Sequence, residues 1–212
     1  MAKFDHHVHT TRYSPDSFIS PAELIGHARE AGLDGVVITE HDHLWMEDEL
    51  EELRGQADGL VVLAGAEVSA MEGHFLVYGL PDLSEVPPGV SLAELIRVVR
   101  RHEAAVVAAH PYRWDQDFDR ILADHGPCFE ALELVSNNIT PQTRRLTERA
   151  LGRHPGLSAT GSSDGHAPKV VGCYYTEFPG PIGTMAEFVA ALKRREGRPG
   201  SSGRWPQTSG SV

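Results

Sequence analysis

The sequence predicts an α/β fold in one domain, and three observations indicate it. Short apolar runs rich in Val, Ile and Ala alternate with stretches of helical periodicity over the first 195 residues. Such alternation is typical of a parallel sheet covered by helices. Polar residues follow directly after predicted strands, at the edge where barrels and open doubly wound sheets both place their functional residues. These patterns leave both architectures open.

The predicted elements follow one another without an internal repeat. Strands are expected at residues 4–9, 35–39, 60–67, 74–78, 104–109, 129–135, 157–160 and 174–178. Helices are expected at residues 21–31, 46–56, 92–102, 118–125, 141–152 and 184–195. The chain from residue 196 consists mainly of Gly, Ser, Pro and Arg. We therefore expect residues 1–195 to form the domain and residues 196–212 to be a flexible tail.

Charge and cysteine content narrow the function classes. The 212 residues include 19 Lys and Arg against 30 Asp and Glu, a formal charge of −11. A protein that binds long nucleic acid through a broad basic face is therefore not expected. Two cysteines, Cys128 and Cys173, indicate neither a disulfide framework nor a thiolate zinc site. No signal peptide and no membrane-spanning run is recognisable, so we expect a cytoplasmic protein that does not contact a membrane.

Three histidines stand together near the N-terminus, in Asp5-His6-His7-Val8-His9-Thr10. Side chains of a strand alternate between its faces, so His7 and His9 should point one way, and His6 and Val8 the other. Two imidazoles on one face are a suitable pair of ligands for a divalent metal. Seven further candidate ligands lie close to the ends of strands: Asp16, His41, Glu67, His74, His110, Asp164 and His166. Imidazole and carboxylate ligands suit Zn, Mn or Fe, and nine ligands are too many for one ion.

These residues fall into an ordered series of motifs. The series runs His7-Val8-His9-Thr10 with Tyr13-Ser14-Pro15-Asp16, then Thr39-Glu40-His41-Asp42, then His110-Pro111, then Ser163-Asp164-Gly165-His166. Glu67 and His74 lie between the second and third motifs. In this order the chain resembles the PHP family (polymerase and histidinol phosphatase) of metal-dependent phosphoesterases over nearly all of its length before the tail. One departure is Glu40, where the family more often has Asp at a position beside the ligands.

The resemblance implies a distorted (β/α)7 TIM-like barrel, the PHP fold, with two or three divalent metal ions (Mn, Fe or Zn). By analogy, the ligand sets would be His7, His9, Glu67 and Asp164 for one ion, Glu67, His74 and His110 for a second, and Asp16, His41 and His166 for a third. It further implies a phosphoric ester hydrolase in which metal-activated hydroxide attacks phosphorus.

Two more residues are candidates for the chemistry. Arg113, three residues after His110, has the planar guanidinium that clamps phosphate, and His43 could protonate the leaving oxygen. The expected substrate is a small phosphomonoester, a nucleotide or a short oligonucleotide, because no basic track lies outside the pocket. Two alternatives stay open: hydrolysis of a C–N or lactone bond, and a non-catalytic PHP accessory module. The sequence does not indicate an oligomeric state.

Overall fold

The computed structural model describes residues 1–203, which contain nine strands and six α-helices. The strands are β1 Ala2–Val8, β2 Gly35–His41, β3 Val61–Ala70, β4 Gly73–Tyr78, β5 Ala105–Ala108, β6 Ala131–Val135, β7 Ser158–Gly161, β8 Tyr174–Phe178 and β9 Arg198–Ser201. The helices are α1 Pro21–Glu30, α2 Glu47–Arg54, α3 Leu92–Arg101, α4 Phe118–His125, α5 Pro141–Arg153 and α6 Met185–Lys193. Every helix and strand expected from periodicity is present, with bounds that differ by a few residues.

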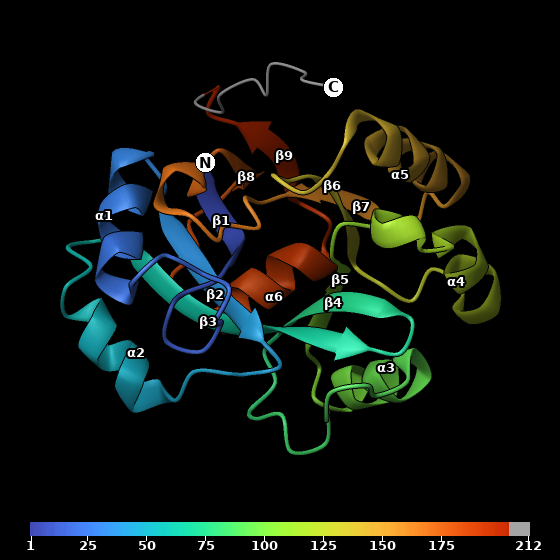
Figure 1. Cartoon of the computed structure of the whole chain (residues 1–212), viewed down its shortest axis with the longest axis horizontal. Helices are drawn as coiled ribbons and strands as arrows, with labels where there is room; N and C mark the ends of the chain where they lie inside the picture. The colour runs from blue at the N-terminus through green and yellow to red at the C-terminus, as the bar shows by residue number, and fades with distance from the viewer. Residues whose placement is uncertain (204–212) are drawn as a thin grey trace.

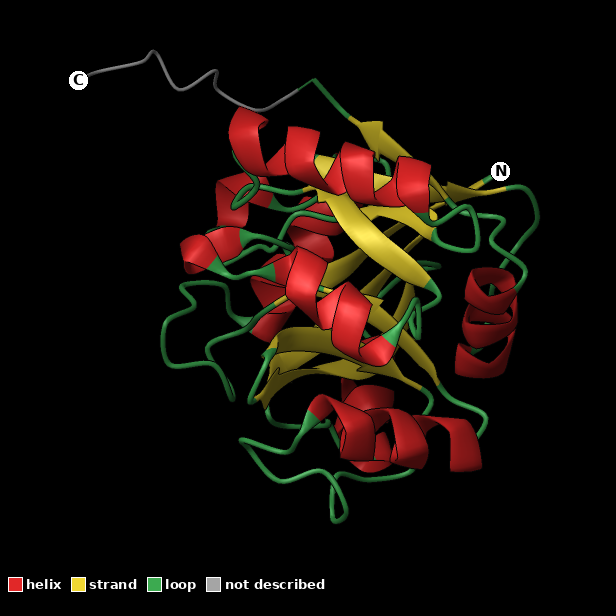
Figure 2. Ribbon diagram, turned by 90° about the vertical axis from the view of Figure 1, so that its right-hand side faces the viewer, coloured by secondary structure: helices red, strands yellow, loops and turns green. Residues whose placement is uncertain are grey.

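The strands form one sheet in the order β7-β6-β5-β4-β3-β2-β1-β8-β9. The sheet curls until its two ends approach each other, and helices surround it (Figures 1 and 2). Near the seam, the Thr176 hydroxyl of β8 donates to the Gly161 carbonyl of β7 at 2.8 Å and accepts from the Gly161 N–H at 3.0 Å. The expected barrel architecture is confirmed as a nearly closed, mixed α/β barrel.

The sheet is mixed, whereas the alternating pattern predicts parallel strands. The pairs β1–β2, β2–β3, β5–β6 and β6–β7 are parallel. The pairs β3–β4, β4–β5, β1–β8 and β8–β9 are antiparallel. Only Met71 and Glu72 separate β3 from β4, and two residues are too few for the crossover that a parallel pair requires.

The expected flexible tail is wrong for part of its length. Residues Arg198–Ser201 form β9, which pairs antiparallel with β8. Since β9 is an edge strand, Pro199 can occupy it without breaking a ladder on both sides. Gly200 lies against the Tyr175 ring, where a Cβ atom would overlap the ring carbons. Residues 204–212 of the expected tail lie outside the described residues.

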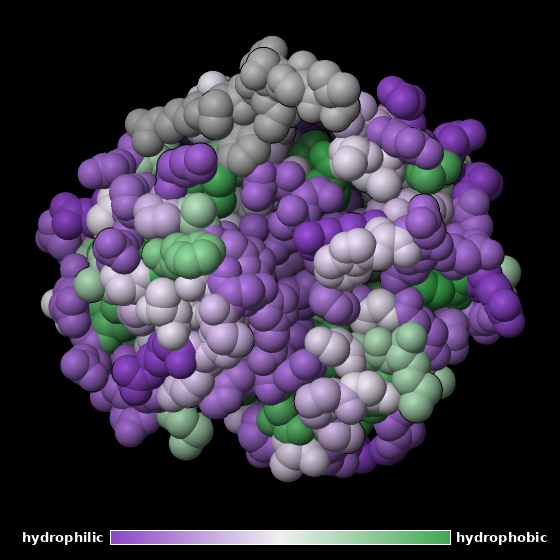
Figure 3. Space-filling view, viewed as in Figure 1, coloured by the Kyte–Doolittle hydropathy of each residue, from purple (hydrophilic) through white to green (hydrophobic). Residues whose placement is uncertain are grey.

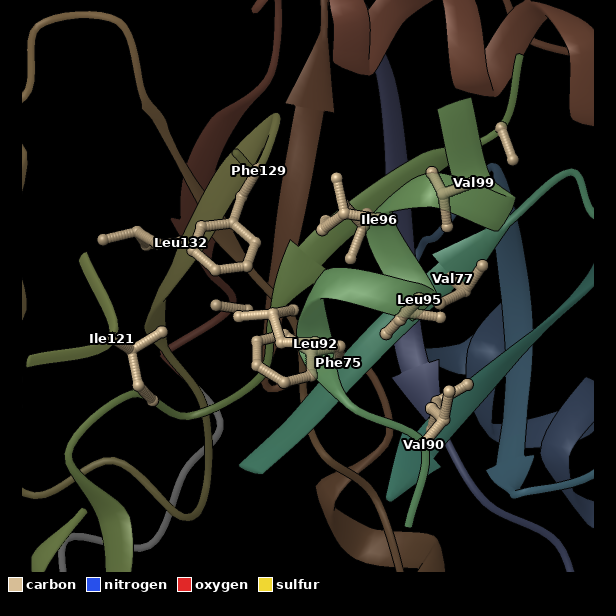
Figure 4. Close-up of a cluster of buried hydrophobic side chains, with 14 of the residues drawn as sticks. Phe75, Val77, Val90, Leu92, Leu95, Ile96, Val99, Ile121, Phe129 and Leu132 are labelled. Atoms are coloured by element: carbon tan, nitrogen blue, oxygen red, sulfur yellow. The ribbon is translucent and has the colours of Figure 1, made fainter. Parts of the chain in front are cut away.

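Apolar clusters on both sides of the sheet hold the barrel and leave one end free. Outside the sheet, α3 presents Leu92, Leu95, Ile96 and Val99 to Phe75 and its neighbours on β4 (Figure 4). Inside, Phe188 of α6 packs on Phe4 and Tyr78, with ring centroids 5.7 and 5.1 Å away. Phe4 lies near the start of β1, so α6 closes the barrel at the N-terminal end of that strand. The opposite end remains for the polar residues. Within residues 1–203, no helix has the length and apolar character needed to span a membrane.

Candidate metal centre

A bulge in β1 points His6 and Val8 in different directions. The pairing of β1 with β2 shifts between Asp5 and Val8. Val8 packs beneath α1, while His6 lies in the interior with Nδ1 2.7 Å from the Tyr78 hydroxyl. The expectation that His6 and Val8 share a face is therefore wrong, because the bulge interrupts strict alternation. His7 and His9 do point to the same place, as predicted.

That place is the carboxylate of Glu67, which rises from β3. Its two oxygens are approached by five histidines: Oε1 lies 2.9 Å from His74 Nδ1 and 3.0 Å from His110 Nε2, and Oε2 lies 3.0 Å from His41 Nδ1, 3.3 Å from His9 Nε2 and 3.4 Å from His7 Nε2. A carboxylate with ligand nitrogens on both oxygens has the arrangement of one that bridges two cations.

Asp164 and Asp16 extend this cluster on two sides. Asp164 Oδ1 lies 3.3 Å from His7 Nε2 and 3.6 Å from His9 Nε2. Asp16 Oδ2 lies 3.2 Å from His166 Nε2 and 3.3 Å from His41 Nε2. The structure therefore brings all nine predicted ligands into one cluster. Within it, three groups have ligand atoms close enough to share an ion: His9, His41 and His166; His7, Glu67 and His110; and His7, His9 and Asp164.

The floor of the cluster contains polar atoms that lack a partner. His7 and His9 are fully buried and Glu67 is 1% exposed, yet His7 Nε2, His9 Nε2 and Glu67 Oε2 accept or donate no hydrogen bond within the described residues. An unpaired buried polar atom costs about 1–3 kcal/mol, and three that face one another are unusual in a native protein. Imidazole nitrogens and a carboxylate oxygen are the donor set of Zn, Mn and Fe sites, so a divalent cation fits these atoms.

The carboxylates of the cluster stay ionised despite their burial. Burial alone would raise the pKa of Glu67, but the charge of His7 and hydrogen bonds from His110 and His41 hold it well below its usual value. The pKa of Asp164 is likewise lowered, since His7 and His9 outweigh the effect of burial. The mouth of the cluster is more exposed to solvent than its floor: the His41, His74 and His166 side chains are about a quarter exposed. Hydrophilic side chains accordingly gather across the middle of the face shown in Figure 3.

A buried glutamate that the sequence reasoning missed orients two of the histidines. Glu133 of β6 lies with Oε1 3.1 Å from His7 Nδ1, and its Oε2 accepts the His110 backbone N–H at 2.8 Å. The Ser162 hydroxyl also donates to Oε1. With Nδ1 of His7 committed to Glu133, Nε2 is left to face Glu67 and Asp164, which is the usual role of a carboxylate behind a metal-binding histidine.

Glu40 holds the loop that carries Asp16. It accepts hydrogen bonds from the Thr10 backbone N–H at 3.0 Å, the Ser14 hydroxyl at 2.6 Å and the Trp45 indole N–H at 3.0 Å. Glu40 is thus a supporting residue, and the longer side chain reaches these donors without entering the cluster.

The structure separates the two predicted catalytic residues. Arg113 lies at the wall of the cluster, with Nη1 3.4 Å from Asp164 Oδ2. The Asn138 amide donates to the same oxygen at 2.6 Å. His43 lies elsewhere: its ring stacks on Tyr13 with centroids 3.7 Å apart, and no hydrogen bond or ion pair within residues 1–203 joins it to the nine predicted ligands.

Comparison with known families agrees with the motifs. The PHP domain family matches residues 5–170, and the PHP-associated family matches residues 147–196. An uncharacterised protein of Methanocaldococcus jannaschii is 30% identical over 120 residues, which cover 52% of this chain and 68% of that protein. The fold and the site thus define a hydrolytic enzyme of the metal-dependent phosphoesterase class. The chain belongs to the PHP domain family.

Solved structures share the fold at low sequence identity. A candidate metal-dependent phosphoesterase from Bifidobacterium adolescentis is 22% identical with a TM-score of 0.62, covering 91% of this chain and 96% of its own. An amidohydrolase from Chromobacterium violaceum with bound sulfate is 18% identical with a TM-score of 0.66, covering 90% and 97%. The lesion-specific endonuclease of Pyrococcus furiosus is 19% identical with a TM-score of 0.69, covering 91% of this chain and 56% of its own.

Proposed function

We propose that the protein hydrolyses a small phosphate ester at a centre of two or three divalent ions (Mn, Fe or Zn). The observation that carries the proposal is the set of three unpaired buried atoms, His7 Nε2, His9 Nε2 and Glu67 Oε2, which face one another. The nine ligands would be His7, His9, Asp16, His41, Glu67, His74, His110, Asp164 and His166. Residues 1–195, together with β9, would form the catalytic domain.

The side chains divide the work of hydrolysis between them. Divalent ions supply a stronger water nucleophile at neutral pH and neutralise charge on the phosphate oxygens. Glu67 spans the cluster and keeps its ligand nitrogens at fixed separations. Arg113 is 28% exposed at the wall, so its guanidinium can turn from Asp164 to a phosphate oxygen that enters the mouth. Asn138 keeps Asp164 in place while it does so.

The role of His43 as the general acid remains a prediction. Its position against Tyr13, away from the nine ligands, gives this assignment no support from geometry. A compartment that keeps thiols reduced, such as the cytoplasm, is part of the proposal, because Cys128 and Cys173 are unpaired.

A small substrate is favoured over long nucleic acid by charge. The formal charge of −11 repels a polyanion, which disfavours long nucleic acid. The Pyrococcus furiosus relative is named as an endonuclease, so an oligonucleotide is the first substrate to test beside monophosphates.

A second candidate is hydrolysis of a C–N bond, which the name of the Chromobacterium violaceum relative favours. The guanidinium of Arg113 beside the cluster favours phosphate, because an amide or lactone offers no anion for it to bind. A non-catalytic module is disfavoured, since all nine ligands are present and lie together.

The test is hydrolysis of p-nitrophenyl phosphate and nucleoside monophosphates by protein of measured metal content. Glu67→Gln is the test variant, because the amide removes the bridging charge at constant shape. Glu130→Gln is the matched control, since Glu130 lies outside the cluster and accepts one backbone hydrogen bond, from Val106 N–H at 2.7 Å. We expect two or three ions and turnover in wild type and control, with both lost in Glu67→Gln. If the protein binds metal and releases amine from amide substrates but releases no phosphate from phosphate esters, the C–N candidate replaces the proposal.

A further inference from the structure

The loop after β5 has a strained backbone beside the cluster. Tyr112, Trp114 and Asp115 have φ angles of 66°, 54° and 57°. Positive φ is uncommon for residues other than glycine, and each such residue costs about 1–3 kcal/mol. Strain of this kind persists only where the surroundings enforce it.

Gln116 enforces it by fastening the loop to the β3–β4 hairpin. Its Nε2 donates to the Glu72 carbonyl at 2.6 Å, and its Oε1 accepts the Tyr112 N–H at 3.3 Å. The amide lies directly over Gly73, where a Cβ atom would overlap Gln116. Two hydrogen bonds and a glycine thus fix a conformation that the loop residues do not favour by themselves.

The strained loop presents Trp114 at the mouth of the cluster. Its side chain is 68% exposed, although a large apolar ring gains free energy when it is buried. The indole centroid lies 5.4 Å from the His74 ring and 5.6 Å from the His110 ring. The Arg113 guanidinium lies 4.0 Å from the indole centroid, and most of the Trp114 side chain remains exposed to solvent.

Beside this indole is a cavity of about 220 Å³. It is bounded by His74, His110, Arg113 and Trp114, with Met71 on its rim. A molecule of liquid water takes about 30 Å³, so the cavity corresponds to about seven waters. That is space for one group of one or two rings.

We propose that Trp114 selects phosphate esters that carry a planar aromatic ring, such as a nucleobase, close to the phosphate. The inference rests on the proposed function, since it takes the phosphate to lie at Arg113 and the cluster. Adjacent residues then hold the two ends of one substrate: the guanidinium holds the anion and the indole stacks on the ring. Stacking on an aromatic side chain contributes about 1–3 kcal/mol per base and tolerates every base.

The test compares adenosine 5′-monophosphate with ribose 5-phosphate, which differ only by the base. The ratio of their kcat/KM values is measured in wild type, Trp114→Phe and Trp114→Leu. We expect a wild-type ratio of about 5-fold to 150-fold, carried by KM, because 1–3 kcal/mol of stacking corresponds to that range. The Phe variant, which retains a ring, should keep most of it, and the Leu variant should bring it close to one. A wild-type ratio near one, or a ratio unchanged in Trp114→Leu, overturns the proposal.

Two further arms separate the possible outcomes. With p-nitrophenyl phosphate, a rise of KM in Trp114→Leu would show that any aromatic ring suffices, while a rise limited to the nucleotide would assign the platform to a nucleobase. If no protein releases phosphate, the proposed function fails and stacking is judged by fluorescence. The part of the tryptophan fluorescence that wild type has and Trp114→Phe lacks is assigned to Trp114. Saturable quenching of this part by adenosine monophosphate, and not by ribose 5-phosphate, would then support stacking on Trp114. Absence of quenching would reject it.

Discussion

Replacing Glu133 with glutamine tests whether this buried carboxylate holds His7 ready for a metal. Glu133 acts only as an acceptor: His7 and Ser162 approach Oε1, and the His110 N–H donates to Oε2. Glutamine has one acceptor oxygen and one NH2 group, so one of these two sides must meet a donor. One buried donor therefore loses its partner, which costs about 1–3 kcal/mol. For a chain of this size that lowers Tm by roughly 2–12 °C.

Metal binding should be weakened as well, by an amount comparable to this loss of stability. Loss of a carboxylate behind a ligand histidine typically weakens metal affinity by about 10-fold to 100-fold, or about 1.4–2.7 kcal/mol. The assay is a titration of metal-free protein with Zn²⁺ against a competing chromophoric chelator. Glu130→Gln is the control, because its one acceptor role survives in the glutamine carbonyl. Equal zinc affinity in Glu133→Gln and wild type would refute the role of Glu133 in orienting His7.

Three further results are expected. Tyr78→Phe should lower the free energy of unfolding in urea by about 1–3 kcal/mol, because it removes the hydroxyl that donates to the His6 carbonyl at 2.9 Å. The substitution creates no cavity, so the loss reports on the hydrogen bond. An unchanged unfolding midpoint would contradict this. Burial raises the pKa of Cys173 to about 12 and that of Cys128 to about 11, so both thiols are protonated at pH 8. In the folded protein they should therefore react with a disulfide reagent at least about 100-fold slower than in protein unfolded by urea. Rapid reaction of the folded protein would show that at least one of the thiols is accessible as thiolate. Removal of metal by a chelator should lower Tm by about 5–11 °C if the ion was present at 100 times its Kd, since binding then contributes about 2.7 kcal/mol. Differential scanning calorimetry before and after chelation measures this shift, and identical scans would argue against a bound ion.

Local patterns account for most of the fold, and they fail where pairing between distant segments decides. The six helices and the strands β1 to β8 could be predicted because periodicity and caps are local, as at Ser20, whose hydroxyl accepts the Glu23 N–H at 3.3 Å. Strand direction at β3 and β4 depends on a two-residue turn that the alternation of elements obscures. β9 has almost no apolar residues, so its strand conformation comes from pairing with β8 and from the fit of Gly200 against Tyr175.

The site shows the same division. The nine candidate ligands could be predicted because their motifs stand near strand ends in order, and the structure brings them together in one cluster. Glu133 carried a usable signal, a single charge inside the apolar run Ala131-Leu132-Glu133-Leu134-Val135, where a buried carboxylate needs a partner. Trp114 carried none, because its exposure follows from a backbone strain that Gln116 and Gly73 impose from another part of the chain. His43 shows the converse: the sequence made it a candidate general acid, and the fold turns its ring toward Tyr13.

The most direct test of the metal centre is a crystal structure of protein reconstituted with Mn, Fe and Zn, with anomalous data collected at each metal edge. We expect two or three anomalous peaks, one of them within ligand distance of His7 Nε2, His9 Nε2 and a Glu67 oxygen, which would be about 2.0–2.2 Å where the ion is zinc. Absence of any peak among these atoms, in crystals where the cluster is ordered, would contradict the central claim that these side chains are ligands.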